Sequence, residues 1–379
     1  MKIADSIEIY STASQESQKN LLYRFHIDLP LLLGLLLISA ASLVILYSAG
    51  GQDSELISRQ AIRLGIAFFV LFILAQISPY HIQRWTPWLF AAGLMLLFSV
   101  LFFGESGKGA QRWLDLVFFR FQPSELMKLV VPMMVAWYLS EQSLPPRLSR
   151  IAYSFLIVFV PVLLIAKQPD LGTSLLVGSA GIFVIFLAGI SWRLIFIFCS
   201  LVAASAPLLW FTLHEYQKAR VLTFINTEND PLGASYHIIQ SKIAIGSGGL
   251  VGKGFLNGTQ TKFDFVPEQS TDFIFCTIGE EHGWLVSFIL IGLFVTLLLR
   301  VIFIAERQKW RFSRVYGYSV ACIMFFHFAV NIGMTIGLFP VIGIPLPFFS
   351  YGGSSLWSFT ILLFILIKLD AHRMQVLVR

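Results

Sequence analysis

The sequence predicts an all-α, polytopic membrane protein with about ten transmembrane helices and one long extracytoplasmic loop. Two observations predict this fold class. Hydrophobic residues make up 56% of the chain and charged residues only 13%, whereas a soluble domain has about 25% charged residues. Apolar stretches of roughly 20 residues, the length that crosses a bilayer, also recur from one end of the chain to the other.

The expected helices form a single integral membrane domain over residues 1–379, beginning with a polar cytoplasmic tail over residues 1–27. The first apolar run is too long for the core of a signal peptide, so we expect it to remain uncleaved as a helix. The apolar spans, about ten in number, lie near residues 28–49, 61–79, 85–103, 125–142, 151–167, 171–190, 192–213, 277–304, 315–338 and 346–370.

Basic residues predict how these helices are oriented. The chain has 27 Lys and Arg against 21 Asp and Glu, an excess that sets topology in a membrane protein, so we expect no nucleic-acid partner. With both termini in the cytoplasm, the short inner loops are basic, most clearly between Arg307 and Arg314. The long loop over residues 214–271 is then extracytoplasmic.

A carboxylate, Asp272, lies at the mouth of the span that follows this loop. Counting back roughly 20–25 residues from Arg300 places the outer boundary of the bilayer near Cys276 to Glu280. At 1.5 Å per residue, Asp272 then lies about 6–12 Å above the hydrocarbon, at head-group depth. A charge at a membrane boundary is costly without a partner or a task, so Asp272 is a candidate functional residue.

Two further carboxylates and two glycines follow near the same boundary. Glu280 and Glu281 are expected to face a polar cavity or a cation, because charge is costly at this depth. Gly279 and Gly283 allow a close helix contact or a bend.

A second pair of charges begins the span near residues 125–142. Pro123 marks the start of a helix, on which Glu125 and Lys128 are three residues apart and share one face. One interpretation is a structural ion pair inside a helical bundle. The other is a binding site for an anionic head group, with Arg112 and Arg120 close by.

The long loop contains two elements of its own. Residues 236–245 have isoleucines near helical spacing and predict an amphipathic helix on the outer interface. Residues 246–254 are rich in glycine but lack the order of a phosphate-binding P-loop, because Gly254 follows Lys253 and Ser247 replaces the first glycine. Lys253 is a candidate contact to lipid phosphates.

The last outer segment, residues 337–355, has enough glycine and proline to break a helix. Irregular backbone at membrane depth is tolerated only where it is buried in protein or lines a cavity. It is therefore either a kinked re-entrant loop or the wall of a groove for a lipid-like substrate.

The seven histidines form no metal-binding pattern, so no metal site is assigned.

Six segments together resemble the SEDS family of bacterial cell-wall proteins, named for shape, elongation, division and sporulation. In two further segments, residues 230–242 and 258–260, the chain is more similar to the elongation branch than to the division branch. Ser270 stands where many members have histidine. The six matching segments are residues 109–113, 122–128, 168–173, 240–250, 267–275 and 345–354.

The resemblance implies a peptidoglycan glycosyltransferase of the bacterial cytoplasmic (inner) membrane that joins lipid II units into glycan strands and releases undecaprenyl pyrophosphate. The family's essential Asp corresponds to Asp272, and its paired Glu and Lys correspond to Glu125 and Lys128. Implied partners are a class B penicillin-binding protein, which is a transpeptidase, and other membrane proteins of the elongation complex. No cofactor is expected to be tightly bound, although a divalent cation, Mg or Mn, is implied as an aid.

The implied reaction joins an α-linked donor into a β-linked product, so it needs one displacement and one base. Asp272 is the candidate base for the acceptor hydroxyl. Lys128, Arg112 and Arg120 are candidates to bind substrate and stabilise the leaving group. Lys253 and Glu268 complete the predicted substrate-binding set.

Two alternatives belong to other classes of protein. A lipid II transporter, or flippase, would need polar sites near mid-membrane that open to both sides. A non-catalytic scaffold for the transpeptidase would not depend on Asp272 for polymerisation. The unusual polar residues crowd the outer face, which favours chemistry at that surface.

Overall fold

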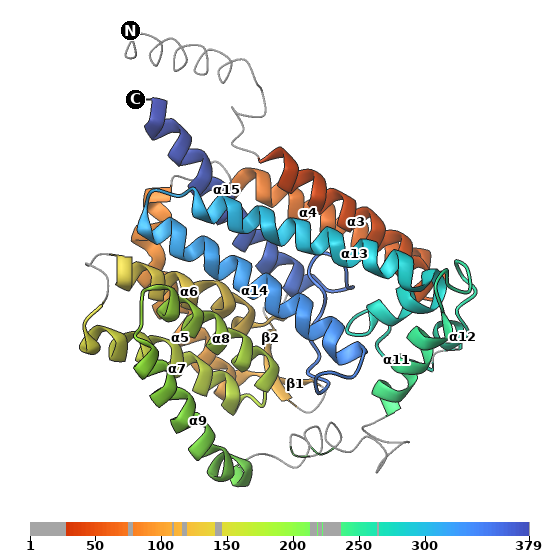
Figure 1. Cartoon of the computed structure of the whole chain (residues 1–379), viewed down its shortest axis with the longest axis horizontal. Coiled ribbons are helices and arrows are strands. Elements are labelled where there is room, and N and C mark those ends of the chain that lie inside the picture. The colour runs from red at the N-terminus through yellow and green to blue at the C-terminus, as the bar shows by residue number, and fades with distance from the viewer. Residues whose placement is uncertain are drawn as a thin grey trace.

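The computed structural model describes residues 28–74, 79–107, 110–115, 120–140, 146–212, 218, 222, 236–263 and 265–378. Within these residues the protein is a bundle of long helices, as the sequence predicts (Figure 1). The cytoplasmic tail over residues 1–27 and most of residues 214–235 lie outside the described residues. The long helices are α3 (Leu29–Ala49), α4 (Ser54–Leu74), α5 (Pro79–Phe103), α6 (Pro123–Ser140), α7 (Leu148–Lys167), α8 (Leu171–Leu187), α9 (Trp192–Thr212), α13 (Ile274–Glu306), α14 (Arg311–Thr335) and α15 (Gly353–Val378).

Each expected span corresponds to one of these helices. By length and composition, 6 helices of the described chain could cross a membrane, and α8 and residues 353–369 of α15 are shorter apolar helices. The all-α, multi-pass fold is therefore confirmed.

Several helix boundaries differ from the prediction by six residues or more, namely the starts of α4, α5 and α15 and the end of α15. Helix α4 begins at Ser54, earlier than expected, because Glu55 and Arg59 form an i,i+4 ion pair in its polar first turns. Helix α15 begins only at Gly353, because residues 336–352 form an irregular segment. Hydropathy misplaced the starts of α4 and α15, because an apolar span leaves out the polar turns of a helix and includes apolar loops beside it.

A small antiparallel sheet, absent from the prediction, lies between α5 and α6. It has the order β1-β2-β3, where β1 is Glu105–Gly107, β2 is Ala110–Asp115 and β3 is Arg120–Phe121. Leu114 pairs with Phe121 in register, and Asp115 pairs with Arg120. The sheet fixes the chain that carries Arg112 next to the start of α6.

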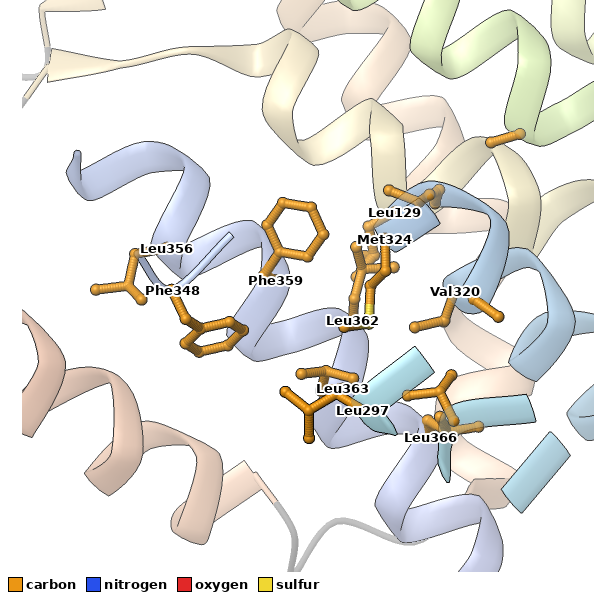
Figure 2. Packing of buried hydrophobic residues seen from close by; sticks show 14 of the residues in the cluster. Leu129, Leu297, Val320, Met324, Phe348, Leu356, Phe359, Leu362, Leu363 and Leu366 are labelled. Atoms are coloured by element: carbon orange, nitrogen blue, oxygen red, sulfur yellow. The ribbon is translucent and has the colours of Figure 1, made fainter. Parts of the chain in front are cut away.

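Helix α15 lies at the centre of the apolar core. Figure 2 shows Phe359 and Leu363 of α15 among side chains from the neighbouring elements, including Leu129 of α6, Leu297 of α13 and Met324 of α14. All of these side chains are buried. Because lipid tails are as apolar as leucine, such helices associate through van der Waals packing rather than through escape from solvent.

Helix α13 is broken near its start by Gly283, whose φ of 72° and ψ of −170° are not helical. The expected bend at the Gly279 and Gly283 pair is therefore present. The break frees backbone groups that would otherwise be unsatisfied at a costly depth. The glycine-rich loop supplies their partners, in the bonds Lys253 N to Glu280 O, Gly254 N to Glu281 O, Trp284 N to Gly249 O and Leu285 N to Leu250 O, of 3.0, 2.9, 3.0 and 3.1 Å.

The amphipathic helix expected at 236–245 is α11 (Tyr236–Ser247), but its packing differs from the prediction. Ile238, Ser241 and Ala244 are buried, and α11 packs against α13 (Figure 1). Ser241 donates a hydrogen bond of 2.7 Å to the Thr335 carbonyl at the end of α14. One face of α11 is therefore buried against the bundle, which the isoleucine spacing did not reveal.

Replacing Gly283 with alanine is expected to destabilise the protein. A Cβ at this position would lie 2.4 Å from the Gly252 nitrogen, and the positive φ is strained for any side chain. We expect a loss of about 1–3 kcal/mol, seen as a lower melting temperature of the purified protein. Gly292→Ala is the matched control, because nothing lies within 4 Å of its Cβ on the same helix. Equal melting temperatures for the two variants would contradict this explanation of the break.

Candidate active site

Asp272 lies two residues before α13, where Asn331 contacts its backbone and Gly343 lies next to its carboxylate. Asn331 of α14 donates one amide hydrogen bond of 2.9 Å to the Asp272 carbonyl and another of 2.7 Å to the Ile344 carbonyl. A Cβ on Gly343 would lie 3.2 Å from the Asp272 Oδ2, so bare backbone faces the carboxylate. The side chain of Asp272 is half-buried. Helix α14 and the irregular segment therefore position this carboxylate together.

The residues just before Asp272 form a tight turn around Glu268. The Glu268 backbone has a φ of 56°, and its carbonyl accepts hydrogen bonds from Thr271 N and Phe273 N. Its carboxylate accepts a bond of 3.0 Å from the Thr271 hydroxyl. The Glu268 side chain is exposed and turned to its own loop, so its contact with substrate stays a prediction.

The irregular segment is tied to the same turn. Tyr351 N donates a hydrogen bond of 2.9 Å to the Ser270 carbonyl. Leu346, Phe348 and Phe349 are buried. The second half of the broken backbone, from Ile344 to Ser350, is thus largely buried in protein, whereas Leu338 and Phe339 in its first half are exposed.

Glu125 and Lys128 form an ion pair of 2.7 Å on one face of α6, as their spacing predicts. Both are buried: the Lys128 side chain is 3% exposed and the Glu125 side chain 11%. Ser358 of α15 donates to the Glu125 carboxylate at 3.0 Å, and the Lys128 Nζ lies 3.4 Å from the His327 Nε2 of α14. The pair therefore joins α6, α14 and α15.

Helix α14 relates this ion pair to Asp272. His327 contacts Lys128, and Asn331, four residues further along, holds the Asp272 backbone. Residues four apart lie on one helix face, about 6 Å along its axis. Neither residue was predicted from the sequence, although two polar residues four apart in an apolar span are a usable signal.

The cations predicted near this pair are placed differently. Arg112 on β2 donates to the Pro169 carbonyl at 2.9 Å and lies 3.8 Å from the Asp170 carboxylate. Asp170 also caps α8 by accepting from Thr173 N at 3.2 Å. Arg112 therefore ties the sheet to the turn between α7 and α8. Of Arg120, the structure describes the backbone in β3 but not the side chain.

Lys253 lies on the buried carboxylate of Glu280, at 2.7 Å from its Oε1. Glu280 is fully buried and also accepts hydrogen bonds from Thr259, Gln260 and Thr261. The expectation that Glu280 faces a cation is confirmed. The Lys253 contact is structural, because it fixes the loop to α13, and a contact between Lys253 and substrate stays a prediction.

Replacing Lys253 with methionine is expected to lower the free energy of unfolding by about 2–3 kcal/mol, because Glu280 would keep its other donors but lose its counter-charge. A chemical denaturation series on the purified protein measures the change. Lys262→Met is the matched control, since Lys262 is exposed on the neighbouring short helix α12 (Thr259–Lys262), and a change within about 0.5 kcal/mol is expected there. A Lys253 variant as stable as this control would refute the pairing.

A cavity of about 700 Å³ opens between α4, α6 and α15, next to the Glu125 and Lys128 pair. This volume falls within the range of about 300–1,000 Å³ typical of small-molecule sites. Its lining is mainly apolar with a few polar groups, and consists of Arg63, Phe121, Gln122, Glu125, Leu126, Leu129, Gly353, Ser354, Trp357, Ser358 and Ile361.

Comparison with known proteins identifies the family of the chain and its class of enzyme. The family model of the FtsW, RodA and SpoVE proteins, described as "Cell cycle protein", matches residues 20–375. The peptidoglycan glycosyltransferase MrdB of Escherichia coli is 46% identical over 351 residues, which cover 92% of this chain and 95% of that protein. The peptidoglycan glycosyltransferase RodA of Treponema pallidum is 31% identical, over 92% of this chain and 98% of that protein.

Solved structures agree with these relatives. The rod shape determining protein RodA of Thermus thermophilus superposes with a TM-score of 0.70 at 29% identity, over 91% of this chain and 97% of that one. A chain from a peptidoglycan synthase complex, described as coordinating polymerization and crosslinking, superposes with a TM-score of 0.80 at 30% identity, over 92% of this chain and 98% of that one. The chain therefore belongs to the FtsW, RodA and SpoVE family and is a multi-pass peptidoglycan glycosyltransferase.

Proposed function

We propose that this glycosyltransferase polymerises lipid II into glycan strands for cell elongation, with Asp272 as the general base. The observation that carries the proposal is the position of Asp272. Its carboxylate faces the bare backbone of Gly343. Asn331, which bonds the Asp272 backbone, lies one turn of α14 from His327, which contacts Lys128. A carboxylate and a nearby cation are the two charges that an inverting displacement on a sugar pyrophosphate needs.

In the proposed step the acceptor 4-hydroxyl oxygen forms a bond to the anomeric carbon of the donor. Asp272 takes the proton of that hydroxyl. The bond from the anomeric carbon to the pyrophosphate oxygen breaks, and its electron pair leaves with undecaprenyl pyrophosphate. One displacement inverts the anomeric centre, so an α-linked donor gives a β-1,4 linkage.

Cations placed on the pyrophosphate side, rather than on Asp272, would stabilise the leaving group without weakening the base. Lys128 suits this role, because its ammonium group contacts Glu125 and His327, and His327 lies one turn of α14 from Asn331, which bonds the Asp272 backbone. Arg112 and Arg120 remain proposed contacts to substrate.

A divalent cation, Mg or Mn, is a further proposed aid. Among the described residues, no three His, Cys, Asp or Glu side chains gather closely enough to hold an ion. The described side chains therefore do not fit a metal held by protein alone, and no step is derived through one. Mg²⁺ commonly binds through substrate phosphates with few protein ligands.

The protein is proposed to lie in the bacterial cytoplasmic membrane with both termini inside. Asp28 at the start of α3 forms a two-pronged ion pair with Arg300 near the end of α13, and Arg307 joins it. This basic end of the bundle is opposite to the end that carries Asp272. The rule that cytoplasmic ends are basic then directs Asp272 and the loop over residues 214–271 outward.

The proposed partner is a class B penicillin-binding protein whose transpeptidase crosslinks the new strands, together with other membrane proteins of the elongation complex. Support comes from the similar chain described as part of a peptidoglycan synthase complex. Co-purification of the tagged chain with its transpeptidase is the direct check.

A reconstitution experiment separates this proposal from its alternatives. Purified protein and its transpeptidase are placed in liposomes with fluorescent lipid II, and both polymer formation and lipid II translocation are measured. The proposal predicts glycan polymer that persists when the active site of the transpeptidase is inactivated. Translocation without polymer would instead support a flippase.

A further inference from the structure

A half-buried arginine, Arg63, lies in α4 just inside the span expected from residue 61, and it lines the cavity next to the Glu125 and Lys128 pair. It is nine residues beyond Ser54, the first residue of α4, about 13 Å along the helix. An ionised side chain inside a membrane span is expensive unless it has a partner or a function. Within the described part of the chain, no carboxylate forms an ion pair with Arg63.

The surroundings of Arg63 make it more electropositive still. A Cβ on Gly353 would lie 3.9 Å from the Arg63 Nε, so the guanidinium is next to the first residue of α15. A helix N-terminus carries a partial positive charge and free N–H groups. Gly353 and Ser354 from this first turn also line the cavity. A cation beside the positive end of a helix is unfavourable unless an anion lies between them.

The guanidinium is also held in place. It lies over the ring of Tyr351, 4.7 Å from the ring centroid. Tyr351 N in turn donates to the Ser270 carbonyl, two residues before Asp272. Arg63 is thus positioned by the same irregular segment that positions the proposed base.

The charges in the cavity favour an anion. Glu125 is the one carboxylate among its lining residues, and Lys128 neutralises it at 2.7 Å. The two cations and one carboxylate leave one net positive charge, located on Arg63. The rest of the lining is mainly apolar, with Phe121, Leu126, Leu129, Trp357 and Ile361.

We propose that this cavity binds the polyprenyl pyrophosphate end of a lipid-linked substrate, with its phosphates between Arg63 and the first turn of α15. The first isoprene units would lie against the apolar lining, notably Trp357. The inference deepens the proposed function, because it assigns Arg63 as a substrate-binding residue for the same reaction. It also places the leaving group near Glu125, the ion-pair partner of Lys128.

Binding of farnesyl pyrophosphate, a short polyprenyl pyrophosphate, tests the proposal. The full chain in phospholipid nanodiscs is titrated with this probe, with farnesol and with inorganic pyrophosphate. We expect farnesyl pyrophosphate to bind most tightly, since it alone offers both the anion and the apolar chain. Phospholipid is present in excess, so binding also measures selectivity over ordinary lipid phosphate.

Variants make the assignment specific to Arg63. Arg63→Gln is expected to weaken farnesyl pyrophosphate binding about tenfold or more, and Arg63→Lys to restore part of it. Arg150→Gln is the matched control, because Arg150 also lies over a tyrosine ring, that of Tyr138, at 5.0 Å. It does not line the cavity and should bind as wild type does. Trp357→Ala should weaken farnesyl pyrophosphate but not inorganic pyrophosphate.

Two outcomes would overturn the proposal: unchanged affinity in Arg63→Gln, or equal affinity for farnesol and farnesyl pyrophosphate. If inorganic pyrophosphate binds as tightly as the lipid probe, the cavity is a plain anion site and the lipid assignment is wrong. Asp272→Asn should keep wild-type affinity for the probe. A defect of Arg63→Gln in binding, and of Asp272→Asn in turnover alone, therefore separates this inference from the proposed function.

Discussion

Replacing Asp272 with asparagine is expected to lower the rate of glycan polymerisation by about 10²–10⁴-fold, the usual contribution of a general base. Asparagine keeps the size of the side chain and leaves the backbone carbonyl free to accept from Asn331. The variant should therefore fold and bind substrate. Polymer length and yield from lipid II, resolved on a gel after a fixed time, measure the effect.

The control for this substitution is Asp53→Asn. Asp53 is exposed, and its carboxylate accepts from Glu55 N at the start of α4. Asparagine can make the same capping bond, so both stability and polymerisation should stay near wild type. Wild-type polymerisation by a folded Asp272→Asn variant would refute the assignment of the base and would favour a scaffold role.

Replacing Lys128 with methionine is expected to destabilise the protein by about 3–5 kcal/mol, because the buried Glu125 would lose its counter-charge. Glu125 would keep only the hydrogen bond from Ser358. The free energy of unfolding is measured by chemical denaturation in detergent. Lys167→Met, at the exposed end of α7, is the matched control and should change stability by no more than about 0.5 kcal/mol.

The double variant Glu125→Gln with Lys128→Met distinguishes the two interpretations of this ion pair. Removing both charges should restore most of the lost stability, because no unpaired buried charge remains. If Lys128 stabilises the leaving group, polymerisation should still fall about 100-fold in the stable double variant. Full activity of that variant would reduce the pair to a structural contact.

The sequence predicts the helices well because membrane spans have a strong one-dimensional signal. Length and hydropathy locate each span, and the few errors occur where polar turns extend a helix, as at Ser54, or where apolar loops imitate one, as before Gly353. The short sheet around Arg112 gives no comparable signal, because its strands are only two to six residues long.

The candidate site is only partly readable in the sequence. Glu125 and Lys128 are close in the chain, so helical spacing alone predicts their contact. Asn331 meets Asp272 across 59 residues, and Arg63 reaches α15 from α4. Such long-range contacts depend on which helices pack against one another, and the prediction of membrane spans does not determine this packing.

For Lys253 the sequence pattern suggested a contact that the structure does not show. A lysine in a glycine-rich loop suggests a phosphate contact, yet its Nζ lies on Glu280. The glycines allow the loop to approach the broken backbone of α13, where a Cβ on Gly248 would lie 1.9 Å from the Gly279 carbonyl oxygen. The pattern is thus explained by close packing, which only the structure reveals.

The most direct test of Asp272 as a base is the single-turnover rate of Asp272→Asn with saturating lipid II, with lipid II affinity measured on the same preparation. Saturation removes any effect of binding, so the rate reports the chemical step. The account predicts wild-type affinity together with a rate about 10²–10⁴-fold lower. A wild-type rate, or a rate defect fully explained by lost affinity, would contradict it.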